Sequence, residues 1–250
     1  MTIDCHVHPA AAGLDAPADL DPRILEDAER LGIDKLIVSS IGSWNYEPPH
    51  GECVKANRDT AAIMKRCGER IVGFCYVNPT FPEAVEELER CVGDFGMRGL
   101  KLWVSNVATD PRVFPVVEKA SQLCIPVLMH AWHKTTGNLP NESRPAQVAE
   151  LAQRFPSVVF IMAHMGGQWQ RGIKAARRVP NLWVDTSGSI VELGMIEEAV
   201  EKLGPERVAF GSDASGVDLP VAFWKVAGAD VSPEAKRLIL GENMRRLLGL

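Results

Sequence analysis

The sequence predicts an α/β protein with a single domain over residues 1–250, built as a (β/α)₈ barrel of the TIM-barrel type. Eight short apolar runs recur along the chain, and a stretch with the apolar spacing of an amphipathic helix follows each of them. Near-continuous apolar strands that alternate with helices indicate a parallel sheet covered by helices. No linker or low-complexity tract divides the 250 residues, and this length is usual for the barrel.

The expected strands lie at regular places along the chain. In order they are TIDCHVH (2–8), KLIVSSI (35–41), IVGFCYV (71–77), GLKLWV (99–104), IPVLMHA (125–131), VVFIMAH (158–164), LWVDTSG (182–188) and RVAFGSD (207–213). The stretch 81–96 illustrates the intervening helices, with Val85, Leu88 and Val92 on one apolar stripe. The last expected helix covers 232–250, where Ser232 is the N-cap and Pro233 occupies the first helical position.

An open, doubly wound sheet is the alternative fold. It is disfavoured because no expected strand leads into a Gly-x-Gly-x-x-Gly turn, and because polar residues end many strands instead of clustering at one switch point. The longest irregular stretches, 42–52 and 132–145, follow expected strand ends. In a barrel such loops lie on the catalytic face.

Composition and charge exclude several classes of function. The net charge of -5 and the pI near 5.7 provide no basic surface for a nucleic acid. No apolar run approaches the length of a membrane-spanning helix, and no leader segment is evident. The six cysteines form no Cys-x-x-Cys pair, which is typical of reduced packing residues. We therefore expect a cytoplasmic protein that acts on a small molecule, and assembly as a homo-oligomer is left open.

The opening of the chain places His6 and His8 two residues apart on an expected strand. Residues at this spacing point to one face, so the two imidazoles converge. A metal site and a pair of solvated side chains are both compatible with this motif alone. By the same alternation, Cys5 and Val7 are expected to face the helices.

Candidate functional residues recur at the ends of the other strands. These residues are Asn78, Lys101, Trp103, His130, His164, Asp185 and Asp213. Closure of the barrel would bring Asp213 beside His6 and His8, with His130 across the mouth. Imidazole and carboxylate ligands suit zinc and similar divalent ions. The alternative for Asp213 is a core carboxylate with a buried partner of its own.

The motifs at these strand ends resemble those of the amidohydrolase superfamily. The resemblance rests on the Asp-x-His-x-His opening, PVLMHA, IMAHMGG and FGSDAS, and it runs nearly end to end. More narrowly, the chain resembles the amidohydrolase-related branch that includes aminocarboxymuconate semialdehyde decarboxylase. The resemblance implies that His6, His8, His130 and Asp213 bind one divalent ion, with His164 as a nearby acid–base or polarising group. Reasoning from the residues alone does not rank His164 against His130.

Lys101 has two interpretations. In some branches of the superfamily a carboxylated lysine at this place bridges two metal ions, so a two-metal site is an alternative. We favour an unmodified Lys101 as a cation for a substrate carboxylate, because carboxylation requires a neutral amine and two nearby metals. Trp103, His133 and Asn78 are the other expected substrate-binding residues, since they lie at or just after strand ends.

The expected activity is hydrolysis of a small amide, lactone or related carbonyl compound by metal-activated water. Asp213 would take the proton of the water, and His164 would polarise the carbonyl. The metal is expected to be zinc, with manganese next. The alternative is a metal-dependent, non-oxidative decarboxylase of a small aromatic or unsaturated acid. A second alternative is a metal-binding or ligand-binding barrel without turnover.

Overall fold

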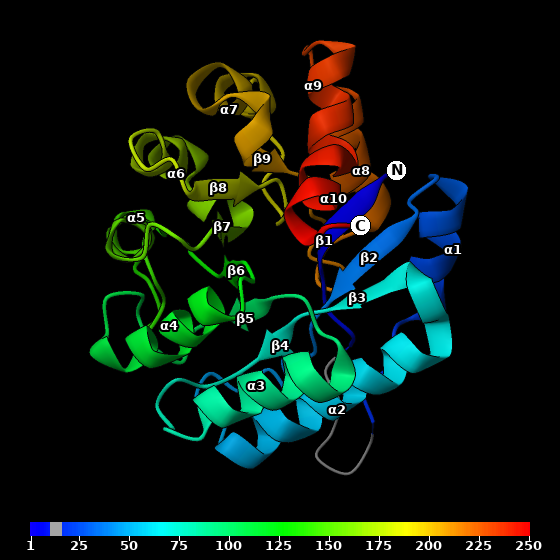
Figure 1. Cartoon of the computed structure of the whole chain (residues 1–250). Coiled ribbons are helices and arrows are strands. Elements are labelled where there is room, and N and C mark those ends of the chain that lie inside the picture. Colours follow the sequence, from blue (N-terminus) through cyan, green and yellow to red (C-terminus); the bar gives the residue numbers. More distant parts are fainter. Residues whose placement is uncertain (11–16) are drawn as a thin grey trace.

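Each expected apolar run forms a parallel strand in the computed structural model, which describes residues 1–10 and 17–250. The strands stand in a ring in the order of the sequence (Figure 1). They are β1 (Ile3–Val7), β2 (Lys35–Val38), β3 (Ile71–Gly73), β4 (Cys75–Tyr76), β5 (Leu100–Leu102), β6 (Val127–Met129), β7 (Phe160–Met162), β8 (Leu182–Asp185) and β9 (Val208–Ala209). The expected (β/α)₈ barrel is confirmed.

The third expected strand is divided at Phe74 into β3 and β4. The Phe74 amide donates to the Val38 carbonyl at 2.9 Å, whereas the next amide, that of Cys75, donates to Gly99 at 2.8 Å. The strand therefore changes its partner from β2 to β5 at this residue. Gly99 permits the change, because a Cβ there would lie 2.4 Å from the Phe74 ring.

Hydrogen bonds between the first and last strands close the barrel. The Cys5 amide donates to the Phe210 carbonyl at 2.9 Å, and the Asp213 amide donates to the His6 carbonyl at 2.7 Å. Val7 also pairs with Ala214 in parallel. The open-sheet alternative is therefore excluded, and the end of β1 lies directly beside the segment that carries Asp213.

Helices surround the ring of strands (Figure 1). The α-helices are α1 (Pro22–Arg30), α2 (His50–Cys67), α3 (Ala84–Phe95), α4 (Phe114–Gln122), α5 (Pro145–Arg154), α6 (Trp169–Ala176), α7 (Met195–Leu203), α8 (Leu219–Ala227), α9 (Pro233–Arg237) and α10 (Asn243–Leu248). Shorter helical segments are η1 (Gly68–Arg70), η2 (Pro111–Val113), η3 (Ala163–Gly166), η4 (Pro205–Arg207) and η5 (Leu238–Glu242). No helix in the described ranges is long and apolar enough to cross a membrane.

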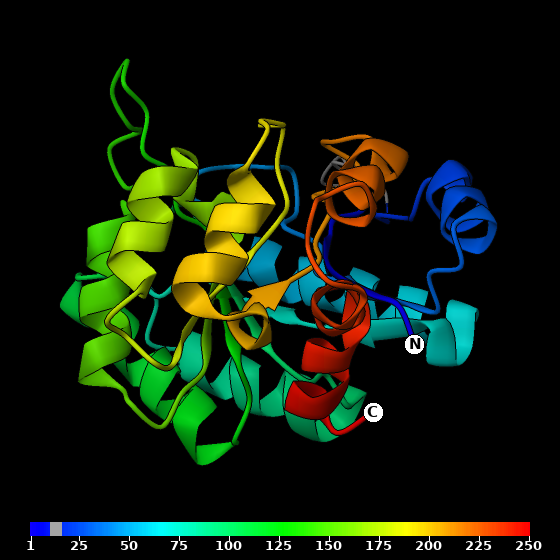
Figure 2. The ribbon, with the colours of Figure 1, turned by 90° about the horizontal axis from the view of Figure 1, so that it is seen from above.

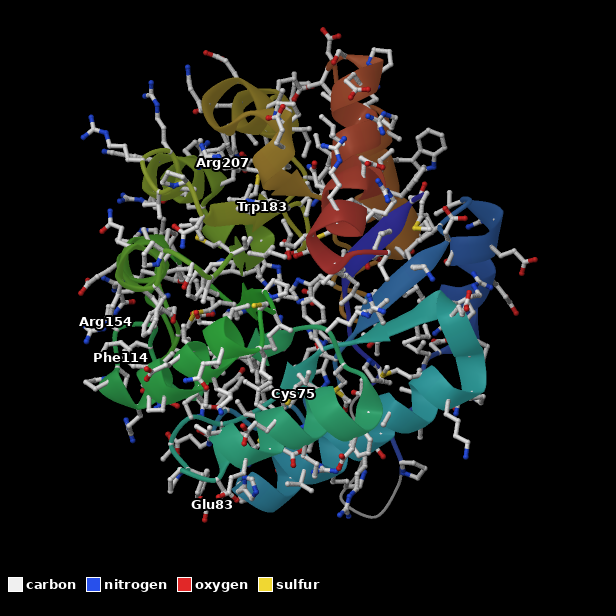
Figure 3. All side chains as sticks on the ribbon, viewed as in Figure 1. Cys75, Glu83, Phe114, Arg154, Trp183 and Arg207 are labelled. Carbon is white, nitrogen blue, oxygen red and sulfur yellow. The ribbon has the colours of Figure 1, made fainter. Side chains whose placement is uncertain are left out.

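Neighbouring helices also contact one another through side chains on the outside of the barrel. The Arg154 guanidinium of α5 lies over the Phe114 ring of α4, 4.2 Å from its centroid (Figure 3). The same ring is 5.9 Å from the ring of Phe155. A cation over an aromatic face adds a modest attraction at a partly exposed position.

The apolar side chains of the strands form two clusters, one between the strands and the helices and one inside the barrel. Leu36, Val127 and Met129 belong to the cluster that includes helix residues, whereas the intervening Ile37 and Leu128 belong to an interior cluster. Met244 and Leu248 of α10 complete the interior cluster. The two faces of each strand are thus both apolar, as expected for a buried parallel sheet.

The expectation for Cys5 is wrong, whereas that for Val7 is confirmed. Cys5 packs in the interior cluster with Ile3, and Val7 packs with the helices. Pairing between β1 and β2 shifts in register between Asp4 and Val7. Strict alternation does not hold across such an irregularity. A one-residue shift in register moves the side chains on one side of it to the opposite face of the sheet.

The expected helix over 232–250 is interrupted. It begins at Pro233 with Ser232 as its cap, as expected, but η5 separates α9 from α10. A Cβ on Gly241 of η5 would lie 2.2 Å from the Met1 carbonyl oxygen. The Ile239 carbonyl also accepts from the Phe210 amide at 2.9 Å. Contact with the residues just before β1 and just after β9 therefore interrupts the helix.

The two ends of the barrel differ. The segment between β6 and α5 and the segment between β8 and α7 project from one end, and α10 lies towards the other (Figure 2). The projecting segments follow the carboxyl ends of parallel strands. This is the end at which barrel enzymes assemble their sites.

Candidate metal centre and active site

His6 on β1 and His8 just after it are two buried imidazoles, and the partner of each Nδ1 atom determines where the ring proton lies. His6 Nδ1 lies 2.8 Å from a carboxylate oxygen of Asp185, and His8 Nδ1 lies 2.6 Å from the Ser39 carbonyl oxygen. Both partners accept hydrogen bonds, so Nδ1 of each ring carries a proton and donates it. The two Nε2 atoms lie 3.0 Å apart.

Both of these imidazoles are neutral near pH 7. Burial lowers the pKa of His6 and of His8 well below the ordinary value, and the positive charge of Lys101 lowers both further. A neutral ring carries one proton, which is on Nδ1, so the two Nε2 lone pairs face each other. Lone pairs at this distance repel unless a positive charge lies between or beside them. Zinc–nitrogen bonds of about 2.0–2.1 Å match this separation.

Asp213 lies beside the two imidazoles. Its carboxylate oxygen Oδ1 is 3.7 Å from His6 Nε2 and 3.8 Å from His8 Nε2. Donor atoms of these three residues lie within 4.8 Å of one another, which is close enough for one metal ion. Burial raises the pKa of Asp213 to about 7, although the charge of Lys101 opposes the rise. The three residues suit a divalent ion, because neutral imidazole and carboxylate are its usual ligands.

Asp185 and Ser187 orient the imidazoles of His6 and His164 through hydrogen bonds to their Nδ1 side. Besides the proton of His6 Nδ1, Asp185 accepts from the backbone amide of His164 at 2.7 Å and from the Ser187 hydroxyl at 2.5 Å. The hydroxyl in turn accepts from His164 Nδ1 at 2.9 Å. Donor atoms of Asp185, His6 and His164 also lie within 4.8 Å of one another, but these hydrogen bonds already engage them. The three therefore form a scaffold for the centre.

His130 and His164 form a second pair of imidazoles. His130 Nδ1 lies 3.2 Å from His164 Nε2, and His130 Nε2 lies 3.0 Å from a carboxylate oxygen of Glu142. Burial lowers the pKa of both imidazoles. Among the described residues, His130 belongs to neither group of donors that lies within 4.8 Å. It lines the same cavity as His6 and His8.

Lys101 lies at the base of the site and is fully buried. Its ammonium donates to His6 Nε2 at 2.6 Å. Burial lowers its pKa to about 8, while the charges of Asp213 and Asp185 act in the opposite direction. The ammonium form therefore predominates at pH 7. Within the described ranges no carboxylate forms an ion pair with it.

A cavity of about 300 Å³ lies above these side chains. Besides the imidazoles, Lys101 and Asp213, four aromatic residues line it: Trp44, Tyr46, Trp103 and Trp132. Three aliphatic side chains and the Lys134–Glu142 ion pair complete the lining. The Tyr46 and Trp103 rings are 5.3 Å apart, and those of Trp44 and Trp103 are 6.1 Å apart. The volume is at the lower end for a small-molecule site.

Several residues of the site have an unusual backbone. Trp44, His164 and Asp213 all have φ between 58° and 67°, in the left-handed region. Such a conformation costs of order 1–3 kcal/mol at a residue other than glycine, and it concentrates at functional sites. Gly211 also serves the site, because a Cβ there would lie 2.9 Å from the Cβ of His6.

Two expected substrate-binding residues do not line this cavity. The Asn78 amide donates to the Pro48 carbonyl at 2.8 Å, and its side-chain oxygen accepts from the Thr80 amide. It therefore holds neighbouring loops together. His133 lines two other surface hollows, because its loop turns outward after Trp132. Neither residue lines the cavity, whereas Lys101 and Trp103 both do.

The sequence carries little signal for the partners of the imidazoles. Glu142 lies within the long stretch 132–145, which the sequence places at the catalytic face, but nothing in its neighbourhood marks this one carboxylate. Ser39 contributes a backbone carbonyl, which any residue would supply. Ser187 lies near the end of the expected strand 182–188, and that position is its only signal.

Comparison with known proteins places the chain in a family. The family model described as amidohydrolase matches residues 3–250, almost the whole chain. The chain belongs to the amidohydrolase family. This result confirms the resemblance drawn from the motifs of β1 and of the later strand ends.

Solved structures of other proteins share the fold of this amidohydrolase. A 2,6-dihydroxybenzoate decarboxylase from Rhizobium has a TM-score of 0.78 at 18% identity, covering 99% of this chain and 98% of that chain. A dihydroxybenzoic acid decarboxylase from Polaromonas with bound manganese and 2-nitroresorcinol has a TM-score of 0.77 at 17% identity, covering 100% and 97%. A 5-carboxyvanillate decarboxylase from Sphingomonas paucimobilis has a TM-score of 0.74 at 18% identity, covering 93% and 84%.

Proposed function

We propose that this amidohydrolase is a metal-dependent, non-oxidative decarboxylase of a small aromatic or unsaturated carboxylic acid. The observation that carries the proposal is the ammonium of Lys101. It is fully buried beside the metal-ligand group, and no carboxylate in the described part of the chain pairs with it. A buried ammonium that forms no ion pair is costly, so the site is suited to an anionic ligand.

The walls of the cavity favour a flat substrate. Trp44, Tyr46, Trp103 and Trp132 present aromatic rings to a space of about 300 Å³. Aromatic rings pack well against planar, unsaturated groups. The decarboxylases with the same fold act on dihydroxybenzoate and carboxyvanillate, as their names state, and this supports decarboxylation over the hydrolysis expected from the sequence.

We propose that His6, His8 and Asp213 hold one divalent ion, with His130 as the fourth ligand. Both Nε2 lone pairs of the first two residues already converge. The manganese of the Polaromonas enzyme supports manganese ahead of the zinc that the sequence suggests. When bound, the ion would polarise a substrate oxygen and help to hold the carboxylate.

The residues of the chain can carry out the remaining chemistry. Lys101 binds an anionic oxygen of the substrate. The Asp213 carboxylic acid donates its proton to the carbon that bears the carboxylate. The bond between that carbon and the carboxylate then breaks, its electron pair returns to the unsaturated system, and carbon dioxide leaves. Asp213 remains as a carboxylate and regains a proton from water, which reaches the 21% of its side chain that is exposed.

His164 is proposed to receive a proton from a substrate hydroxyl. Its Nδ1 donates to Ser187, so its Nε2 keeps a lone pair in the neutral ring. Trp132 lies against it, with ring centroids 5.1 Å apart, and limits the space on that side. When a substrate hydroxyl next to the carboxylate loses its proton, its oxygen donates more electron density to the ring. This favours protonation of the ring carbon that bears the carboxylate.

Release of carbon dioxide tests the proposal. The purified protein is loaded with Mn²⁺ or Zn²⁺ and incubated with hydroxybenzoates, unsaturated dicarboxylic acids, lactones and amides. We expect carbon dioxide from at least one acid, its loss after chelation, and one solvent deuteron in the product when the reaction is run in D₂O. Acid release from a lactone or amide without carbon dioxide would establish the hydrolase instead. Metal binding without turnover of any compound would favour the non-catalytic barrel.

A further inference from the structure

Glu142 is a buried carboxylate on a loop whose tip, residues 135–137, is exposed. It lies between β6 and α5, and only 4% of the residue is exposed. Its oxygens accept from His130 Nε2 at 3.0 Å, from Lys134 Nζ at 2.8 Å and from the Leu139 amide at 3.2 Å. Burial raises the pKa of Glu142, but the hydrogen bonds from His130 and Lys134 outweigh burial and hold it below the ordinary value.

This contact determines the protonation pattern of His130. An ionised carboxylate only accepts hydrogen bonds, so Nε2 of His130 must carry the proton. The neutral ring then has its lone pair on Nδ1, which lies 3.2 Å from His164 Nε2. His164 Nε2 also has a lone pair, because its Nδ1 donates to Ser187. Two acceptors therefore face one point at the edge of the cavity.

We propose that Glu142 is a positioning residue that fixes the tautomer of His130, so that the Nδ1 lone pair is directed into the site, with Lys134 as the ion-pair partner of Glu142. The part that this lone pair plays in metal binding rests on the proposed function. Carboxylate–imidazole pairs of this kind orient metal ligands and make the ring a stronger base. The competing explanation is that Glu142 only anchors the loop.

The substitution Glu142→Gln separates the two explanations. The glutamine oxygen can still accept from Lys134 and Leu139, which preserves the loop. Its NH₂ group then faces His130 and must donate to Nε2. The imidazole proton would move to Nδ1, where it can donate to the lone pair of His164 Nε2. The variant therefore inverts the tautomer and gives up one of two Lys134 contacts, because Lys134 Nζ also donates to the oxygen that faces His130, at 2.9 Å. A purely structural role predicts no inversion.

Nitrogen NMR of histidine-labelled, metal-free protein measures the tautomer directly. His130→Asn identifies the signals of this ring. We expect the Nε2–H form in the wild type, in Glu142→Asp and in Lys134→Met, and the Nδ1–H form in Glu142→Gln. Glu150→Gln, on the exposed surface of α5, is the matched control and should leave the spectrum unchanged. An Nδ1–H form in the wild type would overturn the proposal, even if the glutamine variant failed to fold.

Metal titration provides the second readout. We expect Glu142→Gln to weaken Mn²⁺ binding about 10–100-fold, the usual effect of losing a carboxylate behind a ligating histidine. Unchanged affinity together with an inverted tautomer would overturn the link to the metal. The tautomer measurement uses neither metal nor substrate, so its outcome is independent of whether the enzyme is a decarboxylase.

Discussion

The proton on each imidazole in this site is determined by the partner of its second nitrogen. Asp185 and the Ser39 carbonyl engage Nδ1 of His6 and His8, so both Nε2 lone pairs face the cavity, where that of His6 accepts from Lys101. Asp213 contributes negative charge at 3.7 and 3.8 Å from these two atoms. Neutral donors, one carboxylate and a neighbouring ammonium together favour a metal cation and an anionic substrate.

Asp213→Asn should reduce decarboxylation at least about 100-fold, because the amide cannot supply the proton and general acids contribute about 10²–10⁴-fold. Carbon dioxide release under saturating substrate and metal measures the effect. Asp218→Asn is the matched control, since asparagine can still cap α8 at that exposed position. Wild-type turnover in Asp213→Asn would remove this residue from the proton-donating role.

Lys101→Met should raise KM about 10–100-fold, because a hydrogen bond to a charged group contributes roughly 1.5–3 kcal/mol. Methionine fills a similar volume without the charge. Steady-state kinetics on an acid substrate measures the change, with Lys174→Met on the exposed surface of α6 as the control. An unchanged KM would mean that the ammonium does not bind the substrate.

At the scale of elements, loops at the carboxyl end of the barrel position Asp185 and Ser187, which orient His6 and His164. Lys225 of α8 donates to the backbone carbonyls of Thr186, Ile190 and Gly188 at 2.7, 3.0 and 3.2 Å. These residues flank Ser187, which contacts His6 and His164. One lysine on the outer helix thus holds the loop that orients two imidazoles inside the barrel.

Lys225→Met should lower the free energy of unfolding by about 1–3 kcal/mol, because it leaves buried carbonyls without donors. Urea denaturation measures the loss. Turnover should also fall, since Ser187 loses its support. Trp224→Ala on the exposed side of the same helix serves as the control and should change stability far less. Equal stability of Lys225→Met and the wild type would contradict this role of the lysine.

The turn before η2 gives a prediction for pH. Hydrogen bonds from the Arg112 side chain lower the pKa of Asp110 to about 2. Because the folded-state pKa lies below the ordinary value of 3.8, its stabilising effect is complete above pH 4 and is lost as the pH falls towards 2. Wild type should therefore exceed Asp110→Asn in stability by more at pH 6 than at pH 3. Asp94→Asn on α3 is the control, and a gap independent of pH would contradict the assignment.

At the scale of the whole molecule, closure of the barrel creates the site. Asp213 and His6 are far apart in sequence, and hydrogen bonding between the last segment and β1 brings them together. A metal held by both would bridge the first and last strands. A ligand that binds only the folded state stabilises it, by about 2.7 kcal/mol at a concentration 100 times Kd.

The sequence predicts the barrel because each apolar run is buried on both faces and ends in a polar residue. It also predicts the positions of His6, His8 and Asp213, because strand ends are defined by periodicity. It does not predict Glu142 or the outward turn of His133, because both depend on the path of one long loop. It does not predict the orientation of Cys5 either, because a shift in register leaves no periodic signal.

Anomalous diffraction from crystals grown with Zn²⁺ or Mn²⁺ tests the central claim most directly, because it locates the ion. We predict one peak within about 2.2 Å of His6 Nε2, His8 Nε2 and a carboxylate oxygen of Asp213, close to the usual ligand distances for zinc. Asp213→Asn should weaken that peak. A peak confined to His130 and His164, or no peak under conditions in which the protein is folded, would contradict the account.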